Sequence, residues 1–133
     1  MQYALVAGGS KGIGYAIAVA LAKRNYNLIL VGRQMESLIL AKNSLESSYK
    51  IQVKIIDKDL SLPGSAEAIA AWCNQDQLPL KMLCNVAGLG GKSDFLSLSL
   101  DDLRNMISIN VSAQMALCHC FLNLLEKILR LIF

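Results

Sequence analysis

The amino-acid sequence predicts an α/β fold in which a doubly wound parallel sheet carries helices on both faces. Short apolar runs alternate with segments of helical periodicity along the 133 residues. The apolar run at residues 28–31 is continuous, which is typical of parallel strands covered on both faces. A glycine-rich segment, residues 7–14, separates the first apolar run from the first helical pattern. Strand–helix units repeated in this way build a parallel sheet with right-handed crossovers.

The first two strand–helix units follow from the apolar pattern and from turn residues. Residues 2–7 form the first expected strand, and apolar residues three or four apart predict a helix over residues 12–23. Asn25-Tyr26-Asn27 marks a turn before the second strand, residues 28–31. A second helix is expected over residues 35–49.

The remaining elements repeat the same alternation. Residues 51–56 form a third strand, whose partial polar–apolar alternation favours a place near the sheet edge. Pro63-Gly64 opens a third helix, and Pro79 precedes a fourth strand at residues 80–85. The Asp101-Asp102 pair suits the N-terminus of a last helix that runs toward the chain end.

Two segments are expected to meet at one crevice of this sheet. The expected strand order is 3-2-1-4, and ligands of such sheets bind beyond the carboxyl ends of the strands, where the winding direction reverses. The glycine-rich segment ends the first strand, and Asn85-Val86-Ala87-Gly88 ends the fourth. Both segments therefore border the crevice.

The glycine-rich segment has the features of a phosphate site. Backbone N–H groups at a helix N-terminus have no internal partner, and the helix dipole is positive there. Gly8, Gly12 and Gly14 would give the tight turn, the close backbone approach and the close helix–strand contact. The sequence thus indicates a dinucleotide-binding protein. Because the spacing is G-x-x-x-G-x-G and not G-x-G-x-x-G, an ordinary strand-to-helix turn rich in glycine is the alternative.

Length and charge exclude several classes of function. The chain is long enough for one domain, residues 1–133, and too short for two. Its net charge of +3 is too weak to indicate a nucleic-acid partner. No signal peptide is visible, and polar residues interrupt the uncharged stretch at residues 105–125. We therefore expect a buried helix there and no membrane span.

The four cysteines are expected to be buried or half-buried free thiols in a reducing cytoplasm. Cys118-His119-Cys120 has the residue types of a metal site. Neighbouring residues on a helix point to different faces, however, and the sequence offers no second ligand pair. No metal is expected.

Four short motifs occur in an order and at separations that characterise one enzyme family. They are Gly8-x-x-x-Gly12-Ile13-Gly14, Asp59-Leu60, Asn85-Val86-Ala87-Gly88 and Ile109-Asn110-Val111. On these motifs the chain resembles the amino-terminal half of a short-chain dehydrogenase/reductase. Ala7 and Val86 stand where the family often has threonine and asparagine. The resemblance implies a Rossmann-like fold truncated before the later strands, a nicotinamide cofactor, and hydride transfer between a small-molecule carbonyl and an alcohol.

The resemblance also implies the residues of the site. Those expected to bind the cofactor are Gly8, Ser10, Lys11, Gly12, Ile13, Gly14, Arg33, Asp59, Leu60, Asn85, Ala87 and Gly88. Asp59 would meet the edge of the adenine ring, or it is simply a turn or capping residue before Ser61. Asn110 would support the catalytic site from within the last helix, or it bonds only to backbone or water.

The residues after the second strand favour NADP over NAD. An acidic residue there would bind the ribose 2′-hydroxyl of NAD. The sequence has Gly32-Arg33 at that place and no carboxylate before Glu36, and Lys11 adds a second positive charge. An arginine fork can pair with a 2′-phosphate. The alternative is that Arg33 and Lys11 are ordinary solvated charges.

The catalytic Ser, Tyr and Lys of the family are not evident. None of the tyrosines at positions 3, 15, 26 and 49 is followed by lysine four residues later, as Tyr-x-x-x-Lys requires. Without this proton donor the chain alone is expected to be inactive or nearly so. The first interpretation is the cofactor-binding half of an NADP-dependent oxidoreductase. The alternatives are a non-catalytic NADP-binding or scaffold module and, more weakly supported, a nucleotide-binding fold for another small ligand.

The last helix predicts self-association. One apolar stripe includes Leu117 and Phe121, and a second includes Val111, Met115 and Leu122. A helix with two apolar sides requires burial on both. One side can cover the sheet, and the other is expected to form a homo-oligomer.

Overall fold

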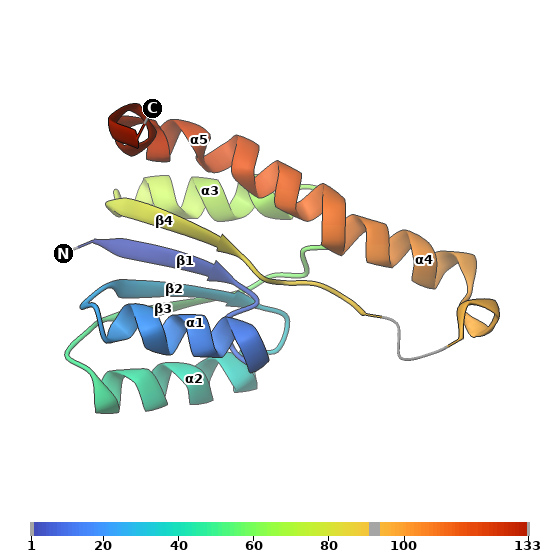
Figure 1. Cartoon of the computed structure of the whole chain (residues 1–133), viewed down its shortest axis with the longest axis horizontal. Helices are drawn as coiled ribbons and strands as arrows, with labels where there is room; N and C mark the ends of the chain where they lie inside the picture. Colours follow the sequence, from blue (N-terminus) through green and yellow to red (C-terminus); the bar gives the residue numbers. More distant parts are fainter. Residues whose placement is uncertain (1, 91–93, 133) are drawn as a thin grey trace.

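The computed structural model describes residues 2–90 and 94–132. Its centre is a four-stranded parallel sheet with the order β3-β2-β1-β4, which confirms the predicted strand order (Figure 1). The strands are β1 (Tyr3–Ala7), β2 (Asn27–Gly32), β3 (Val53–Asp57) and β4 (Leu80–Asn85). The helices are α1 (Gly12–Ala22), α2 (Met35–Ser48), α3 (Ser65–Gln75), α4 (Leu100–Ile107) and α5 (Ala113–Ile132). Two shorter elements are a 3-10 helix, η1 (Phe95–Ser97), and a π-helix, η2 (Ser108–Ser112).

The central strand is β1, and every residue of it is buried. It pairs with β2 on one side and with β4 on the other, so that Ala7 lies opposite both Val31 and Asn85. This register brings the carboxyl ends of the three strands to the same edge of the sheet. The glycine-rich segment and the segment after β4 therefore leave the sheet side by side.

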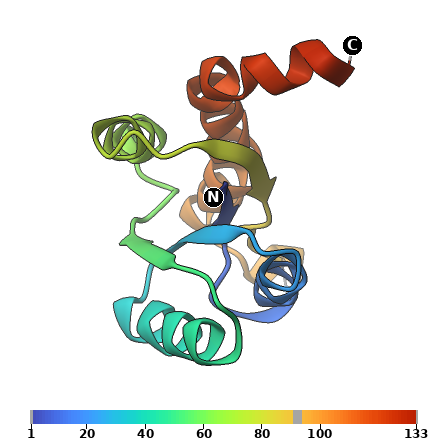
Figure 2. The same cartoon turned by 90° about the vertical axis from the view of Figure 1, so that its left-hand side faces the viewer.

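Helices cover both faces of the sheet, as Figure 2 shows in a view along the strands. On one face α1 and α2 pack against β1 and β2 through Ala18, Leu21, Leu38 and Leu45. On the other face α3 and α5 contact each other and bury Ile69, Leu117 and Phe121. Leu38, Leu45 and Ile69 are fully buried, so the fold has an apolar core on each side of the sheet.

The last helix differs from the single element that the sequence predicts. Ser99 caps α4 by accepting a hydrogen bond from the Asp102 backbone N–H, and the Asp102 carboxylate accepts from the Ser99 backbone N–H. Between α4 and α5 the chain forms the π-helix η2, in which the hydrogen-bond ladder is widened for one turn. Asn110 is the central residue of this turn.

Among the described residues, no helix combines the length and apolar character needed to cross a membrane. Of the four cysteines, Cys73 is buried, Cys84 and Cys120 are half-buried, and Cys118 is exposed, so the expectation of buried or half-buried thiols is wrong for Cys118. Burial raises the pKa of the Cys73 thiol to about 11.

Candidate functional site

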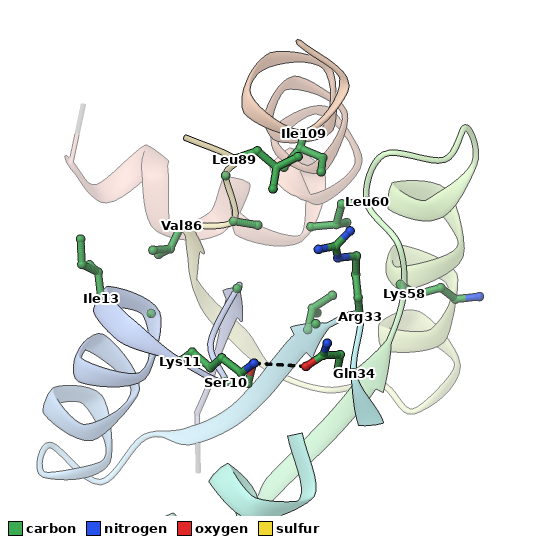
Figure 3. A pocket seen from close by; sticks show the side chains of 16 residues that line it. Ser10, Lys11, Ile13, Arg33, Gln34, Lys58, Leu60, Val86, Leu89 and Ile109 are labelled. Carbon is green, nitrogen blue, oxygen red and sulfur yellow. Dashed lines mark hydrogen bonds between the residues drawn. The ribbon is translucent and has the colours of Figure 1, made fainter. Parts of the chain in front are cut away.

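A cavity of about 430 Å³ opens at the carboxyl edge of the sheet, between the ends of β1, β2 and β4 (Figure 3). The sequence-predicted residues that line it are Gly8, Ser10, Lys11, Ile13, Gly14, Arg33, Leu60, Ala87 and Gly88. The lining also contains Val31, Gly32, Gln34, Lys58, Val86, Leu89 and Ile109, which were not predicted as site residues. Predicted residues outside the lining are Gly12, Asp59, Asn85 and Asn110.

The glycines of the first loop are required by close packing. A Cβ on Gly8, whose φ is +88°, would lie 2.7 Å from the Ala87 backbone nitrogen. A Cβ on Gly14 would collide with the Gly8 carbonyl oxygen. Gly12 differs, because its φ is +53° but, apart from adjacent residues and the backbone of its own helix, no heavy atom of the described residues lies within 4 Å of the Cβ position. Gly8 and Gly14 thus hold the loop against α1 and the end of β4, whereas Gly12 is required only by its backbone conformation.

The N-terminus of α1 faces this cavity through Ile13 and Gly14. Its N-cap residue, Lys11, makes no side-chain cap, and the first turn contains no acidic residue. The first N–H groups of the helix therefore have no side-chain acceptor. Bare amides at the positive end of a helix dipole fit the donor set that a phosphate group requires.

Basic residues surround the part of the cavity near β2. Lys11, Arg33 and Lys58 belong to the lining, and none of the described residues that line the cavity is acidic. Figure 3 shows Arg33 extending along the cavity toward Leu60, while the Lys58 side chain points away. Lys11 Nζ donates to Gln34 Oε1 at 3.1 Å. The lining therefore carries a positive charge that favours an anionic ligand.

Asp59 is engaged in a turn. Its Oδ1 accepts hydrogen bonds from the Ser61 hydroxyl at 2.6 Å and from the Ser61 backbone N–H at 2.9 Å. These bonds, with a smaller contribution from the positive charge of Arg33, hold the pKa of the carboxyl below its usual value. The turn role that the sequence left open is thus present, while the neighbouring Leu60 lines the cavity.

Asn110 positions a cavity wall without lining the cavity. Its Oδ1 accepts from the Leu89 backbone N–H at 2.7 Å, and its Nδ2 donates to the Leu89 carbonyl at 2.8 Å. A Cβ on Gly88 would lie 3.0 Å from the same Oδ1. The amide of η2 therefore fixes the segment that follows β4, and Gly88 leaves room for it.

Asn85 ends β4 beside α5. Its Nδ2 donates to Cys118 Sγ at 3.3 Å. Its Oδ1 is buried and has no hydrogen-bond partner among the described residues. The next two residues, Val86 and Ala87, line the cavity. Their backbone N–H groups both donate to the Ala7 carbonyl, at 3.0 and 2.7 Å, and so hold them beside the end of β1.

Most lining residues that the sequence analysis did not predict could have been found from their position just after a strand. Gln34 comes two residues after the end of β2, and Lys58 directly follows β3. Val86 and Leu89 follow β4 in the same way. Since all parallel strands end at one edge, residues just beyond each strand are candidates even without a motif. Val86 and Ile109 also belong to two of the sequence motifs, Asn85-Val86-Ala87-Gly88 and Ile109-Asn110-Val111, although neither was itself predicted to bind the cofactor.

The fold and the place of this cavity define an α/β protein of the Rossmann type: the cavity lies at the switch point of a 3-2-1-4 sheet, above a glycine-rich strand-to-helix turn. A family model described as short chain dehydrogenase matches residues 2–128. The chain belongs to this family of short-chain dehydrogenases.

Similar proteins agree with this membership. The chain is 33% identical over 114 residues to a very-long-chain 3-oxoacyl-CoA reductase of Candida glabrata, covering 84% of this chain and 32% of the relative. It is 33% identical over 130 residues to hydroxysteroid dehydrogenase-like protein 1 of Gallus gallus, covering 95% and 39%. Among solved structures, L-sorbose reductase of Gluconobacter frateurii, complexed with NADPH and L-sorbose, is 25% identical with a TM-score of 0.86, covering 95% and 48%. The chain thus spans 32% and 39% of the length of these two curated relatives and about half of the solved structure.

Proposed function

We propose that this chain binds NADP in the cavity at the end of the sheet and forms the coenzyme-binding part, residues 1–133, of an oxidoreductase. The observation that carries the proposal is the composition of the cavity. It combines helix N–H groups without a side-chain cap, Lys11 and Arg33, and its lining, within residues 2–90 and 94–132, contains no acidic side chain. A dinucleotide pyrophosphate fits the amides, and an additional 2′-phosphate fits the basic residues.

The preference for NADP over NAD follows from the residues after β2. A carboxylate at this place would accept hydrogen bonds from the ribose hydroxyls of NAD and would repel a phosphate. Arg33 and Gln34 hold the place instead, and the first acidic residue, Glu36, lies outside the lining. That L-sorbose reductase was solved with NADPH is consistent with this proposal.

A bound coenzyme would supply or accept a hydride. The residues of this chain would hold the coenzyme in place. The N-terminus of α1 binds the pyrophosphate, and Leu60 and Ile109 offer apolar contact to a ring. Asn110 fixes Leu89 at the cavity wall. The proposed substrate of the whole protein is a small-molecule carbonyl or alcohol, in line with the oxoacyl and hydroxysteroid names of the relatives.

A second candidate function is a non-catalytic NADP-binding or scaffold module. It is favoured by one observation, that none of the four tyrosines is followed by lysine four residues later. Without such a pair, the chain offers no evident proton donor for a developing alkoxide. Both candidates share the coenzyme site, and they differ in whether the whole protein reduces a carbonyl.

We further propose a cytoplasmic homo-oligomer that associates through α4 and α5. Ile107, Val111, Met115 and Leu122 are at least 47% exposed and follow one another at helical spacing. Burying such a stripe against a second copy removes apolar surface from water. The Met115→Lys change is expected to yield monomers in sedimentation velocity, whereas Ile39→Lys, on the exposed face of α2, leaves the oligomer intact. Unchanged association of both variants would contradict this interface.

Calorimetric titration of the purified chain with NADPH and NADH tests the coenzyme proposal. We expect NADPH to bind at least about tenfold more tightly, because charge-assisted hydrogen bonds contribute about 1.5–3 kcal/mol. Equal affinities would contradict the preference, and binding of neither would contradict the coenzyme site. The same preparation, assayed with NADPH and a panel of ketones, is expected to show no turnover.

A further inference from the structure

Gln34 connects the two sides of the basic cavity. It follows Arg33 at the end of β2 and is the N-cap residue of α2, yet its side chain makes no capping bond to the helix. Instead, its Oε1 accepts one hydrogen bond from Lys11 Nζ at 3.1 Å and one from Ser37 Oγ at 3.3 Å. Figure 3 shows the Lys11–Gln34 bond crossing between the glycine-rich loop and the start of α2.

Without this bond, Lys11 would be a free surface side chain. A lysine side chain has four rotatable bonds, and holding it in one place costs about 1.5–2 kcal/mol of rotamer entropy. Lys11 is exposed and forms no ion pair among the described residues. Gln34 Oε1 is the acceptor that directs its ammonium group toward the cavity, and the half-buried Ser37 in turn directs Gln34.

Because the Gln34 side chain is neutral, it holds Lys11 without cancelling the charge of the ammonium group. A carboxylate at this position would also accept from Lys11, but it would cancel the positive charge. An amide oxygen holds the ammonium group and leaves its charge available to an anion. The bond to Gln34 thus holds Lys11 at the lining of the cavity before any ligand binds.

We propose that Gln34 is a positioning residue that holds Lys11 at the cavity and thereby strengthens discrimination in favour of a ligand with a 2′-phosphate. This inference rests on the proposed NADP function. Gln34 acts through Lys11 and not by its own contact, so its effect disappears when Lys11 is absent. The geometry assigns Ser37 a smaller role in the same direction.

The test is a double-mutant cycle on the full chain, read out by binding and not by activity. The probes are 2′,5′-ADP and 5′-AMP, which differ by the 2′-phosphate, and the measured quantity is the ratio of their dissociation constants by calorimetry. Wild type, Gln34→Ala, Lys11→Met and the double variant are compared. The control is Gln75→Ala, which changes an exposed glutamine outside the cavity. Circular dichroism of each variant tests whether it is folded.

We expect Gln34→Ala to lower the preference for 2′,5′-ADP about threefold to tenfold, from the lost preorganisation of Lys11. The same change is expected to have no effect in the Lys11→Met background, and Ser37→Ala is expected to lower the preference less. An unchanged or increased preference in Gln34→Ala, or an equal loss in both backgrounds, would overturn the role of Gln34 while leaving NADP binding intact. A wild-type chain that binds neither probe would overturn the coenzyme proposal itself and this inference with it.

Discussion

Substitutions of Gly8 and Gly12 by alanine separate two contributions to stability, the packing around the glycine and its backbone conformation. Gly8→Ala places a methyl group 2.7 Å from the Ala87 nitrogen and 2.8 Å from its Cα, at a φ of +88°. The neighbouring atoms are backbone, so they cannot move aside by a rotamer change. Positive φ costs an alanine about 1–2 kcal/mol, and overpacking against fixed atoms costs about 1–3 kcal/mol. We therefore expect Gly8→Ala to lower the free energy of unfolding by about 2–5 kcal/mol.

Gly12→Ala is the matched control. Its φ is also positive, at +53°, but in the described part of the chain the added methyl group meets no heavy atom within 4 Å beyond its neighbours and its own helix backbone. Only the conformational cost of about 1–2 kcal/mol is expected. Urea denaturation followed by the fluorescence of Trp72, the only tryptophan, measures both variants against wild type.

Gly8→Ala is also expected to weaken NADPH binding, because Ala87 belongs to the cavity lining. Equal destabilisation by the two substitutions would refute the argument that Gly8 is required by its contact with the segment after β4. A Gly8→Ala variant as stable as wild type would refute both parts of the reasoning.

Three further predictions concern the site and the core. Arg33→Ala is expected to weaken NADPH binding by about 1.5–3 kcal/mol and leave NADH binding unchanged in calorimetric titrations; an equal loss for both would contradict the phosphate role. Asn110→Ala removes two hydrogen bonds from the Leu89 backbone, so stability should fall by about 1–3 kcal/mol and the Leu89 amide should lose hydrogen-exchange protection. Burial raises the pKa of Cys73 from 9.0 to about 11, so its contribution to stability is complete below pH 9 and is lost as the pH rises to about 11. Cys73→Ala should therefore flatten the decline of unfolding free energy over that range, and an unchanged slope would contradict it.

Much of the fold is encoded by local patterns. The continuous apolar run at residues 28–31 lies within β2, whose first five residues are buried, and the partly alternating run at residues 51–56 overlaps the edge strand β3. The strand order follows from the reversal of winding after β3 and is confirmed. These features depend on periodicity and on crossover handedness, both of which can be derived from sequence.

The details of the site depend on contacts between distant residues. The Asn110 side chain forms hydrogen bonds with the backbone of Leu89, 21 residues earlier. Asn110 lies in the π-helix η2, which contains no glycine or proline from which this irregular turn could be predicted. Asp59 forms a turn with Ser61, a role that the sequence analysis named only as the alternative to contact with the adenine ring. Gln34 belongs to none of the sequence motifs. It contacts Lys11 only because the fold brings the glycine-rich segment beside the start of α2.

The most direct test of the coenzyme site is an amide chemical-shift titration of the nitrogen-15-labelled chain with NADPH. The largest shifts are expected at residues 12–14 and at Arg33, where α1 and β2 border the cavity. Shifts confined to the hollow around Tyr49 and Gln52, at the opposite edge of the sheet, or no shifts at saturating NADPH, would contradict the assignment.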